Sequence, residues 1–207
     1  MSYVLSPTMA TSTVAKIVFR SRNLAAGLPL LYAFFATRWA WQNTAAVWTL
    51  AAALCVLGVA VRSWSAMYCG YGSGEHKTLA RGGPYRLVRN PLYWGNILLI
   101  LAGVAASRLV WLIPLAALWS FAVFHAVVRG EEGRLQRRFG APYVEYLESV
   151  PRWFPRALLA AAPLGDALGP RHGAARVARQ LTGFLVLVPF LVKELNLCSL
   201  WSHATGS

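Results

Sequence analysis

The stretch GGPYRLVRNPLYWGN, residues 82–96, gathers side chains that could do chemistry into one short segment. Arg86 and Arg89 lie three residues apart, between Tyr85 and Tyr93. This pattern is typical of an anion site with an aromatic wall, where arginine binds a carboxylate and a tyrosine face lies against a sulfonium or a purine. Arginines that bind lipid phosphates, beside tyrosines of a membrane interface belt, would give the same pattern. The stretch alone leaves both interpretations open.

A second set of ionisable residues follows a later apolar run. Glu131 and Glu132 are adjacent at the mouth of this run, where an anionic leaflet and the C-terminal end of a helix dipole would both disfavour them. Their charge needs compensation, either from Arg129 and Arg134 in a salt-bridge cluster or from a cationic or hydroxyl-bearing ligand. His125 lies near the end of the same run, and it is either a functional residue or an interhelical hydrogen-bond partner.

Several chemistries have no support in the sequence. It contains no Ser-His-Asp order, no metal-ligand cluster, no phosphate-binding glycine loop and no dinucleotide fingerprint, so hydrolase and kinase functions are not indicated. Cys55, Cys69 and Cys198 lack the spacing of a zinc site. We therefore expect no metal site, and the cysteines are expected to act as small hydrophobic residues.

The composition indicates an integral membrane protein. Of the 207 residues 57% are hydrophobic and 13% are charged, and the mean hydropathy is +0.48. A soluble domain of this size is rarely so apolar. Residues 1–207 are predicted to form a single membrane domain, and the first 23 residues lack the order of a cleaved signal peptide.

The apolar segments predict an all-α bundle of about five transmembrane helices. They cover residues 24–41, 44–61, 95–107, 109–128 and 181–201. The third is short, because its residues rise about 20 Å in a helix whereas the hydrocarbon core is roughly 30 Å thick. It should therefore either borrow residues 92–94 or stop short of one interface. The fifth is interrupted by Pro189 and by Lys193-Glu194, so it either spans the membrane or lies in its interface.

The net charge of +13 is explained by topology rather than by nucleic acid. Of the 20 lysines and arginines only Arg38, Arg108 and Lys193 fall outside three segments, which are the N-terminus and residues 62–94 and 129–180. The positive-inside rule places these three segments in the cytosol, where they also meet anionic membrane lipids. We therefore expect a bacterial inner-membrane protein whose N-terminus and functional loops are cytosolic.

An amphipathic helix is predicted in the last of these basic segments. Its apolar residues recur at spacings of three and four, with a break near residues 140–142; they are Leu135, Phe139, Tyr143, Tyr146 and Leu147. This pattern favours a helix that lies in the membrane interface.

Two blocks of the sequence together resemble a known superfamily. HKTLARGGPYRLVRNPLYWGN is followed, after a two-helix hairpin, by EEGRLQRRFGAPYVEYLESVPRWFP. In content, order and separation they are similar to the isoprenylcysteine carboxyl methyltransferase and phospholipid methyltransferase superfamily of integral membrane enzymes. The resemblance covers roughly residues 58–156, with a motif-bearing core at 62–156 and a C-terminal extension at 157–207 that could add a helix.

The resemblance implies a methyltransferase that uses S-adenosylmethionine, bound at the cytosolic ends of the helices. The positions implied as cofactor-binding are Lys77, Thr78, Leu79, Ala80, Tyr85, Arg89, Asn90, Pro91, Leu92, Tyr93 and Glu132. Those implied on the acceptor side as catalytic are Arg129 and Glu131. The expected partner is a lipophilic small molecule or lipid that accepts the methyl group.

One departure from the family pattern bears on the chemistry. Many members have Arg-His-Pro where this chain has Arg89-Asn90-Pro91, and an asparagine cannot act as a general base. A carboxylate acceptor needs no base, whereas a phenol or an amine would need one, for which Glu131, Glu132 and His125 are the candidates. Phospholipid N-methylation and a non-enzymatic scaffold that keeps the pocket remain as alternatives.

Overall fold

The computed structural model describes residues 21–36, 44–69, 79–155 and 174–195, and every regular element in these ranges is helical. The elements in chain order are α2 (Leu28–Phe35), α3 (Thr44–Tyr68), η2 (Gly83–Arg86), α4 (Pro91–Ala106), η3 (Val110–Leu112), α5 (Ile113–Phe139), α6 (Ala141–Ser149), α8 (Ala174–Gln180) and η4 (Leu181–Leu187). Residues 21–26 and 188–195 are also helical. The all-α prediction is confirmed for this part of the chain.

Two of these helices are long and apolar enough to cross a membrane. They are α3 and the continuous run Val110–Phe139 that contains α5. Helix α4 is shorter, and the predicted first span is represented by α2, which has 8 residues and begins after a turn at Gly27. The described residues therefore support a membrane bundle with two candidate spans, and they do not establish the predicted five.

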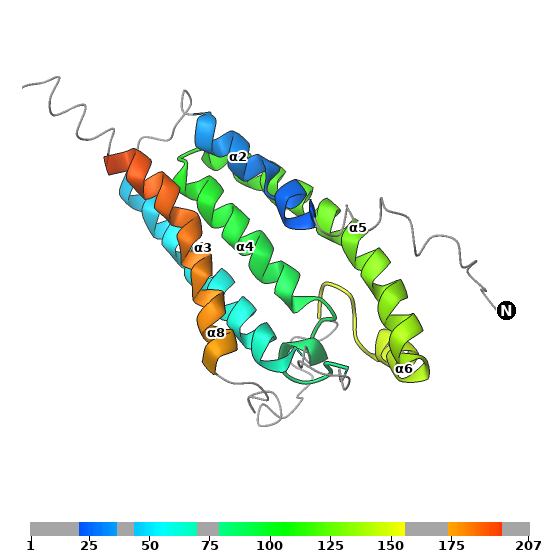
Figure 1. The fold of residues 1–207 in the computed structure, drawn as a ribbon. Coiled ribbons are helices and arrows are strands. Elements are labelled where there is room, and N and C mark those ends of the chain that lie inside the picture. The colour runs from blue at the N-terminus through cyan, green and yellow to red at the C-terminus, as the bar shows by residue number, and fades with distance from the viewer. Residues whose placement is uncertain (1–20, 37–43, 70–78, 156–173, 196–207) are drawn as a thin grey trace, which may run out of the picture.

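Helix α4 is the centre of the bundle, since it packs against α2, α3, α5 and η4 (Figure 1). It begins at Pro91, so it includes residues 92–94 as predicted from its short apolar run. Proline suits the first turn of a helix, where no intrahelical partner awaits its missing amide hydrogen. Close approach to α3 depends on small residues, because a Cβ on Gly95 would lie 2.9 Å from the carbonyl oxygen of Gly58.

The C-terminal run from α8 through η4 to residue 195 lies along α3 and α4 (Figure 1). Arg62 of α3 donates to Gln180 at 2.8 Å and also to Asn96 of α4. At the far end Glu194 forms an ion pair with Arg108, in the turn between α4 and η3. The described part of this segment thus packs beside α3, and it is not among the helices long and apolar enough to cross a membrane.

The end of α5 differs from the sequence prediction. The apolar run stops at residue 128, but the helix continues to Phe139, so Glu131 and Glu132 lie within it. The argument that a helix C-terminus disfavours these carboxylates was therefore wrong. The predicted break is confirmed at Gly140, which has a φ of 60° and joins α5 to α6. Because α6 turns back, its buried Tyr146 reaches the motif stretch, where its hydroxyl donates to the Tyr85 carbonyl.

Candidate functional site

The first motif block is held in place by a tight turn beneath Tyr68. Gly83 has a φ of +55°, which glycine adopts without strain, and a Cβ there would lie 2.5 Å from the Tyr68 ring. The following residues Pro84 and Tyr85 are buried in η2. The backbone then leaves helical geometry up to Asn90, as expected of a residue before proline. Glycine and proline thus set the path that brings Arg89 to the start of α4.

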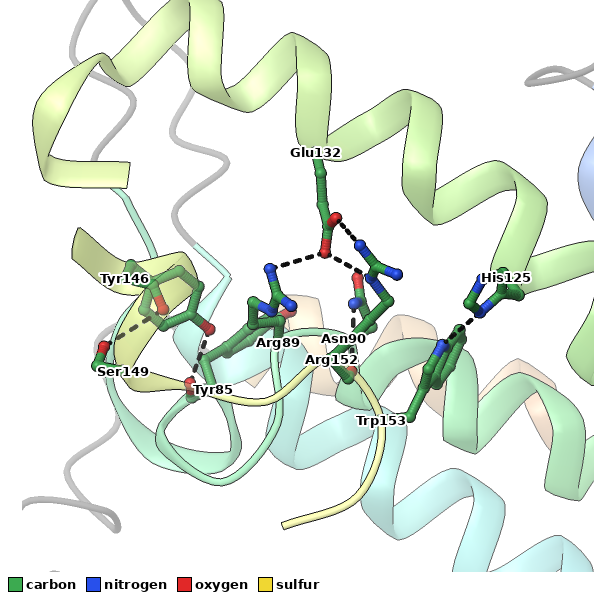
Figure 2. Close-up of polar contacts among 9 residues, drawn as sticks. All are labelled: Tyr85, Arg89, Asn90, His125, Glu132, Tyr146, Ser149, Arg152 and Trp153. Atoms are coloured by element: carbon green, nitrogen blue, oxygen red, sulfur yellow. Dashed lines mark hydrogen bonds and ion pairs between the residues drawn. The ribbon is translucent and has the colours of Figure 1, made fainter. Parts of the chain in front are cut away.

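The centre of the site is Glu132, which is only 9% exposed. Arg152 donates to both of its carboxylate oxygens, from Nε to Oε1 at 3.0 Å and from Nη2 to Oε2 at 2.6 Å. Arg89 approaches from the opposite block, with its Nη1 3.1 Å from Oε1 (Figure 2). The two motif blocks therefore meet at one buried carboxylate, which two guanidinium groups neutralise and orient.

Arg152 is placed by contacts on both sides of it in the segment 150–155. The Asn90 side-chain amide donates to the Arg152 carbonyl at 3.3 Å, and the indole of Trp153 donates to Nδ1 of His125 at 3.1 Å (Figure 2). Trp94 in turn donates to the Trp153 carbonyl at 2.9 Å. These bonds fix the segment against α4 and α5, so Arg152 reaches Glu132 from a chain without regular structure.

Glu131 occupies a neighbouring environment. The Tyr93 hydroxyl donates to its Oε2 at 2.8 Å, and the Tyr93 ring packs against Phe124 with a centroid separation of 4.8 Å. The Arg22 guanidinium carbon lies 5.8 Å from the centre of the Tyr93 ring, within the range of a cation–π interaction. The two adjacent carboxylates therefore have different partners, namely a phenol for Glu131 and two arginines for Glu132.

Two buried tyrosines of α6 close the site from the side. Burial raises the pKa of Tyr143 well above its usual value, and the negative charge of Glu132 raises it further. Burial also raises the pKa of Tyr146, whose hydroxyl donates to the Tyr85 carbonyl at 2.7 Å. The hydrogen bond from Arg152 to Glu132 raises the pKa of that guanidinium. Arg152 and the two tyrosines thus keep their protons throughout the physiological range.

The structure brings together only part of the predicted set. Arg89, Asn90, Tyr93, Glu131 and Glu132 converge, whereas Pro91 and Leu92 shape the start of α4. Leu79 and Ala80 are half-buried before the Gly82 turn, and Tyr85 contributes its carbonyl to the bond from α6. Lys77 and Thr78 lie outside the described residues.

Of the arginines selected from the sequence, Arg89 holds Glu132, whereas Arg129 and Arg134 are exposed on α5. Of the two sources of compensation considered for the glutamates, the cluster with Arg129 and Arg134 is therefore not the one found at Glu132, which pairs with Arg89 and Arg152. Arg86 lies apart from Arg89, in a groove of about 250 Å³; the groove is lined by Arg81, Arg86, Glu145, Tyr146, Ser149 and Val150. His125 accepts a hydrogen bond from the Trp153 indole, which agrees with its interpretation as a hydrogen-bond partner.

Arg152 is the residue that sequence reasoning missed. It lies 20 residues after Glu132 and belongs to no local spacing with it. The available signal was the placement of a basic residue between Pro151 and Trp153 at the end of the second block.

The described residues contain no group of three or more His, Cys, Asp or Glu side chains that could hold a metal ion.

Comparison with known proteins agrees with the two motif blocks. Residues 46–142 match the family model described as phospholipid methyltransferase. The chain is 34% identical over 123 residues to the nickel-cobalt-cadmium resistance protein NccN of Alcaligenes xylosoxydans xylosoxydans, covering 58% of this chain and 56% of that protein. It is 35% identical over 106 residues to the cobalt-zinc-cadmium resistance protein CzcN of Cupriavidus metallidurans, covering 50% of this chain and 49% of that protein.

The aligned parts have limits that bear on function. The chain spans about half the length of the curated relatives it matches. No solved structure matches it significantly. The family model nevertheless includes the motif stretch, the hairpin of α4 and α5 and both glutamates, although Arg152 lies beyond its end. Over residues 46–142 the chain therefore matches the phospholipid methyltransferase family model, which falls in the superfamily of isoprenylcysteine and phospholipid methyltransferases.

Proposed function

We propose that this protein transfers a methyl group from S-adenosylmethionine to a lipophilic acceptor at the membrane. One observation carries the proposal: Arg89 of the first motif block and Glu132 of the second meet in a buried contact, inside the segment that matches the methyltransferase family. The family match supports a membrane methyltransferase in general. The cofactor and the class of acceptor are our inference from the residues.

The residues at the site fit the proposed cofactor. S-adenosylmethionine carries a carboxylate, an ammonium, a sulfonium and a purine, and when bound it supplies an electrophilic methyl group. The site offers two arginines, two carboxylates and the buried ring of Tyr93, and the Nε of Arg89 is buried without a hydrogen-bond partner. Such an unused donor suits a polar ligand. Arg89 and Tyr93 are the residues that we expect to contact it, with Glu132 orienting Arg89.

The acceptor side is proposed from Glu131 and the surrounding apolar surface. Glu131 is half-buried, is bonded to Tyr93 and is a possible proton acceptor for a phenol or an amine. A carboxylate acceptor would need only orientation, for which Arg129 is the candidate. Phe154 is 65% exposed beside the site and offers apolar surface to a lipid chain. Phospholipid N-methylation is the alternative within this activity.

Methyl transfer from a sulfonium depends mainly on alignment and on exclusion of water. The buried tyrosines of α6 and the aromatic rings around Trp153 exclude water on two sides of the cluster. We place this end of the bundle at the cytosolic surface of a bacterial inner membrane, because the exposed arginines of α5 are on it and the positive-inside rule puts such residues in the cytosol. The cofactor would then enter from the cytosol and the acceptor from the lipid.

Isothermal titration tests the cofactor directly. Purified protein in detergent and in lipid nanodiscs is titrated with S-adenosylmethionine, S-adenosylhomocysteine and NADPH. We expect binding of both sulfur nucleosides and none of NADPH. The absence of heat with either nucleoside in both environments would refute the proposal. A labelled methyl group should then appear in a lipid extract, and its absence across carboxylate, phenol and amine acceptors would favour the scaffold alternative.

A physiological setting is suggested by the names of the relatives. Both are described as metal resistance proteins, whereas the described residues of this chain hold no cluster suited to bind a metal. We therefore propose that any contribution to resistance acts through a methylated membrane component. Growth of a deletion strain on nickel, cobalt and cadmium, complemented by wild type or by Glu131→Gln, tests this. Equal rescue by both would separate resistance from methyl transfer.

A further inference from the structure

Both carboxylate oxygens of Glu132 accept from arginine. Oε1 receives the Arg152 Nε at 3.0 Å and the Arg89 Nη1 at 3.1 Å, and Oε2 receives the Arg152 Nη2 at 2.6 Å. Three of the roughly four lone-pair positions of the carboxylate are used, so a cationic ligand would have to share it with two guanidinium groups. The contacts therefore favour Glu132 as the group that orients the arginines over Glu132 as the main partner of an ammonium or a sulfonium. Its role in the described conformation is to hold the two arginines.

The two arginines carry more charge and more donors than Glu132 uses. Two guanidinium groups face one carboxylate, and each guanidinium has five N–H donors in a planar fork. The Nε of Arg89 is buried and has no hydrogen-bond partner among the described residues. Leaving a charged group partly unsatisfied away from water costs free energy, so a ligand that accepts from it would be favoured.

We propose that Arg89 and Arg152, oriented by Glu132, form a binding site for a carboxylate. The proposal rests on the proposed function for the source of this group, which is either the α-carboxylate of the cofactor or the carboxylate of a lipophilic acceptor. Both sources present the planar, singly charged group that a guanidinium fork binds with two parallel hydrogen bonds. Arg152 is thus a ligand-binding residue, in addition to its contact with Glu132.

The neighbours of the pair favour a carboxylate over a more highly charged anion. Glu131 precedes Glu132 in the chain and accepts a hydrogen bond from the Tyr93 hydroxyl, whereas both arginines pair with Glu132. Both glutamates act electrostatically on the buried Tyr143, as do Arg89 and Arg152, so all these groups border one small region. Arg89, Arg152 and Glu132 together carry one excess positive charge, which a singly charged carboxylate matches and a phosphate dianion exceeds.

The same geometry explains why the segment 150–155 is tied down so firmly. Arg89 donates its backbone N–H to the Pro151 carbonyl at 2.9 Å, and Asn90 donates to the Arg152 carbonyl. The two residues of the first block therefore hold the segment 150–155, which supplies the second guanidinium. A fork that is fixed before the ligand arrives loses less conformational freedom on binding, which strengthens the interaction.

The test compares ligands with and without the carboxylate on the intact protein in nanodiscs. S-adenosylhomocysteine is titrated against its decarboxylated analogue, and decanoate against decanamide, into wild type, Arg152→Gln, Arg152→Lys and Arg89→Gln. Arg137→Gln is the matched control, because this exposed arginine of α5 makes no recorded contact with Glu132. Circular dichroism and size-exclusion chromatography check the fold, and Arg152→Lys keeps the charge if Arg152→Gln fails to fold.

If the cofactor supplies the carboxylate, wild type and Arg137→Gln bind S-adenosylhomocysteine at least 10-fold more tightly than its decarboxylated analogue. Arg152→Gln and Arg89→Gln reduce this ratio toward one, and Arg152→Lys gives an intermediate ratio because it loses the fork. If the acceptor supplies it, the same pattern appears for decanoate over decanamide while the nucleoside ratio is unchanged.

Two outcomes overturn the inference in different ways. Wild-type binding of S-adenosylhomocysteine without a carboxylate preference in either ligand pair refutes the carboxylate site and leaves the proposed function standing. A preference that persists in folded Arg152→Gln and Arg89→Gln also refutes the site, because the carboxylate then binds elsewhere. No nucleoside binding at all refutes the proposed function, whereas decanoate discrimination alone still supports the site.

Discussion

Glu132→Gln tests the buried cluster most directly, because it keeps the shape of the side chain and removes only its charge. Arg89 and Arg152 then face each other without the carboxylate that separates and neutralises them. Removing one partner of a fully buried ion pair costs about 3–5 kcal/mol. The side chain of Glu132 is 11% exposed and that of Arg89 13%, but that of Arg152 is 31% exposed, so water screens part of the loss.

The glutamine amide oxygen can still accept one of the hydrogen bonds from the two arginines, which lowers the cost further. We therefore expect the free energy of unfolding to fall by about 2 kcal/mol. For a domain of this length such a change lowers Tm by roughly 4–8 °C. Arg152→Gln should cost a similar amount, since it leaves Glu132 with Arg89 alone.

Cys55 provides the assay, because it is fully buried in α3 and becomes reactive only when the bundle opens. In a background with Cys69→Ser and Cys198→Ser, a thiol-reactive dye follows thermal unfolding through Cys55 alone. Glu145→Gln is the matched control. Its carboxylate lies 3.7 Å from Arg81 but is 77% exposed, so we expect a change within about 0.5 kcal/mol.

The reasoning fails if Glu132→Gln lowers Tm no more than Glu145→Gln does. A double variant adds a second criterion. Because Arg152 and Glu132 share a network, combining Glu132→Gln with Arg152→Gln should cost clearly less than the sum of the two single changes. Strict additivity would mean that the contact contributes nothing to the stability of the bundle.

Three further changes follow from the structure. Gly83→Ala should lower Tm by several degrees, because a Cβ there meets a buried ring at a φ of +55°, whereas Gly130→Ala has open space and should raise it slightly. The pKa of Tyr146 is higher in the folded protein than its unfolded value of ~10, so its contribution to stability is complete below pH ~10. The free energy of unfolding, measured with the dye, should therefore fall as the pH rises above this value, and Tyr146→Phe should remove part of this fall. Glu194→Gln should cost about 1–3 kcal/mol in the same assay, because it leaves a largely buried Arg108 without its ion-pair partner.

Helix starts and breaks were predictable because proline and glycine act locally. Pro91 begins α4 and Gly140 ends α5, as their backbone restrictions predict. Helix ends without such residues were not predictable from hydropathy. The apolar window of the second segment stops at residue 61, yet α3 continues to Tyr68, because Arg62 finds hydrogen-bond partners in the C-terminal run and in α4. A polar side chain therefore ended the apolar pattern without ending the helix.

The site residues that lie within one motif block were predictable from the sequence. A residue that the fold brings to the site from a distant part of the chain was not. Arg89 and Tyr93 follow from the first motif, and Glu132 from the second. Arg152 depends on the reversal at Gly140 and on the indole anchors of the segment 150–155, neither of which appears as a periodic pattern. For the same reason the sequence favoured Arg129, which is close to the glutamates along the helix but exposed on its surface.

Position 90 illustrates how the fold changes the meaning of a motif residue. Asparagine there excludes proton transfer, and from the sequence this departure from Arg-His-Pro bore on the reaction. In the structure the Asn90 amide donates to the backbone carbonyl of Arg152, the same residue whose side chain binds Glu132. An amide donates in this way at any pH near neutrality, whereas a histidine would do so only with a proton on the nitrogen that faces the carbonyl. The asparagine therefore acts on the site by holding the segment that carries Arg152, which is a positioning role that needs no titratable group.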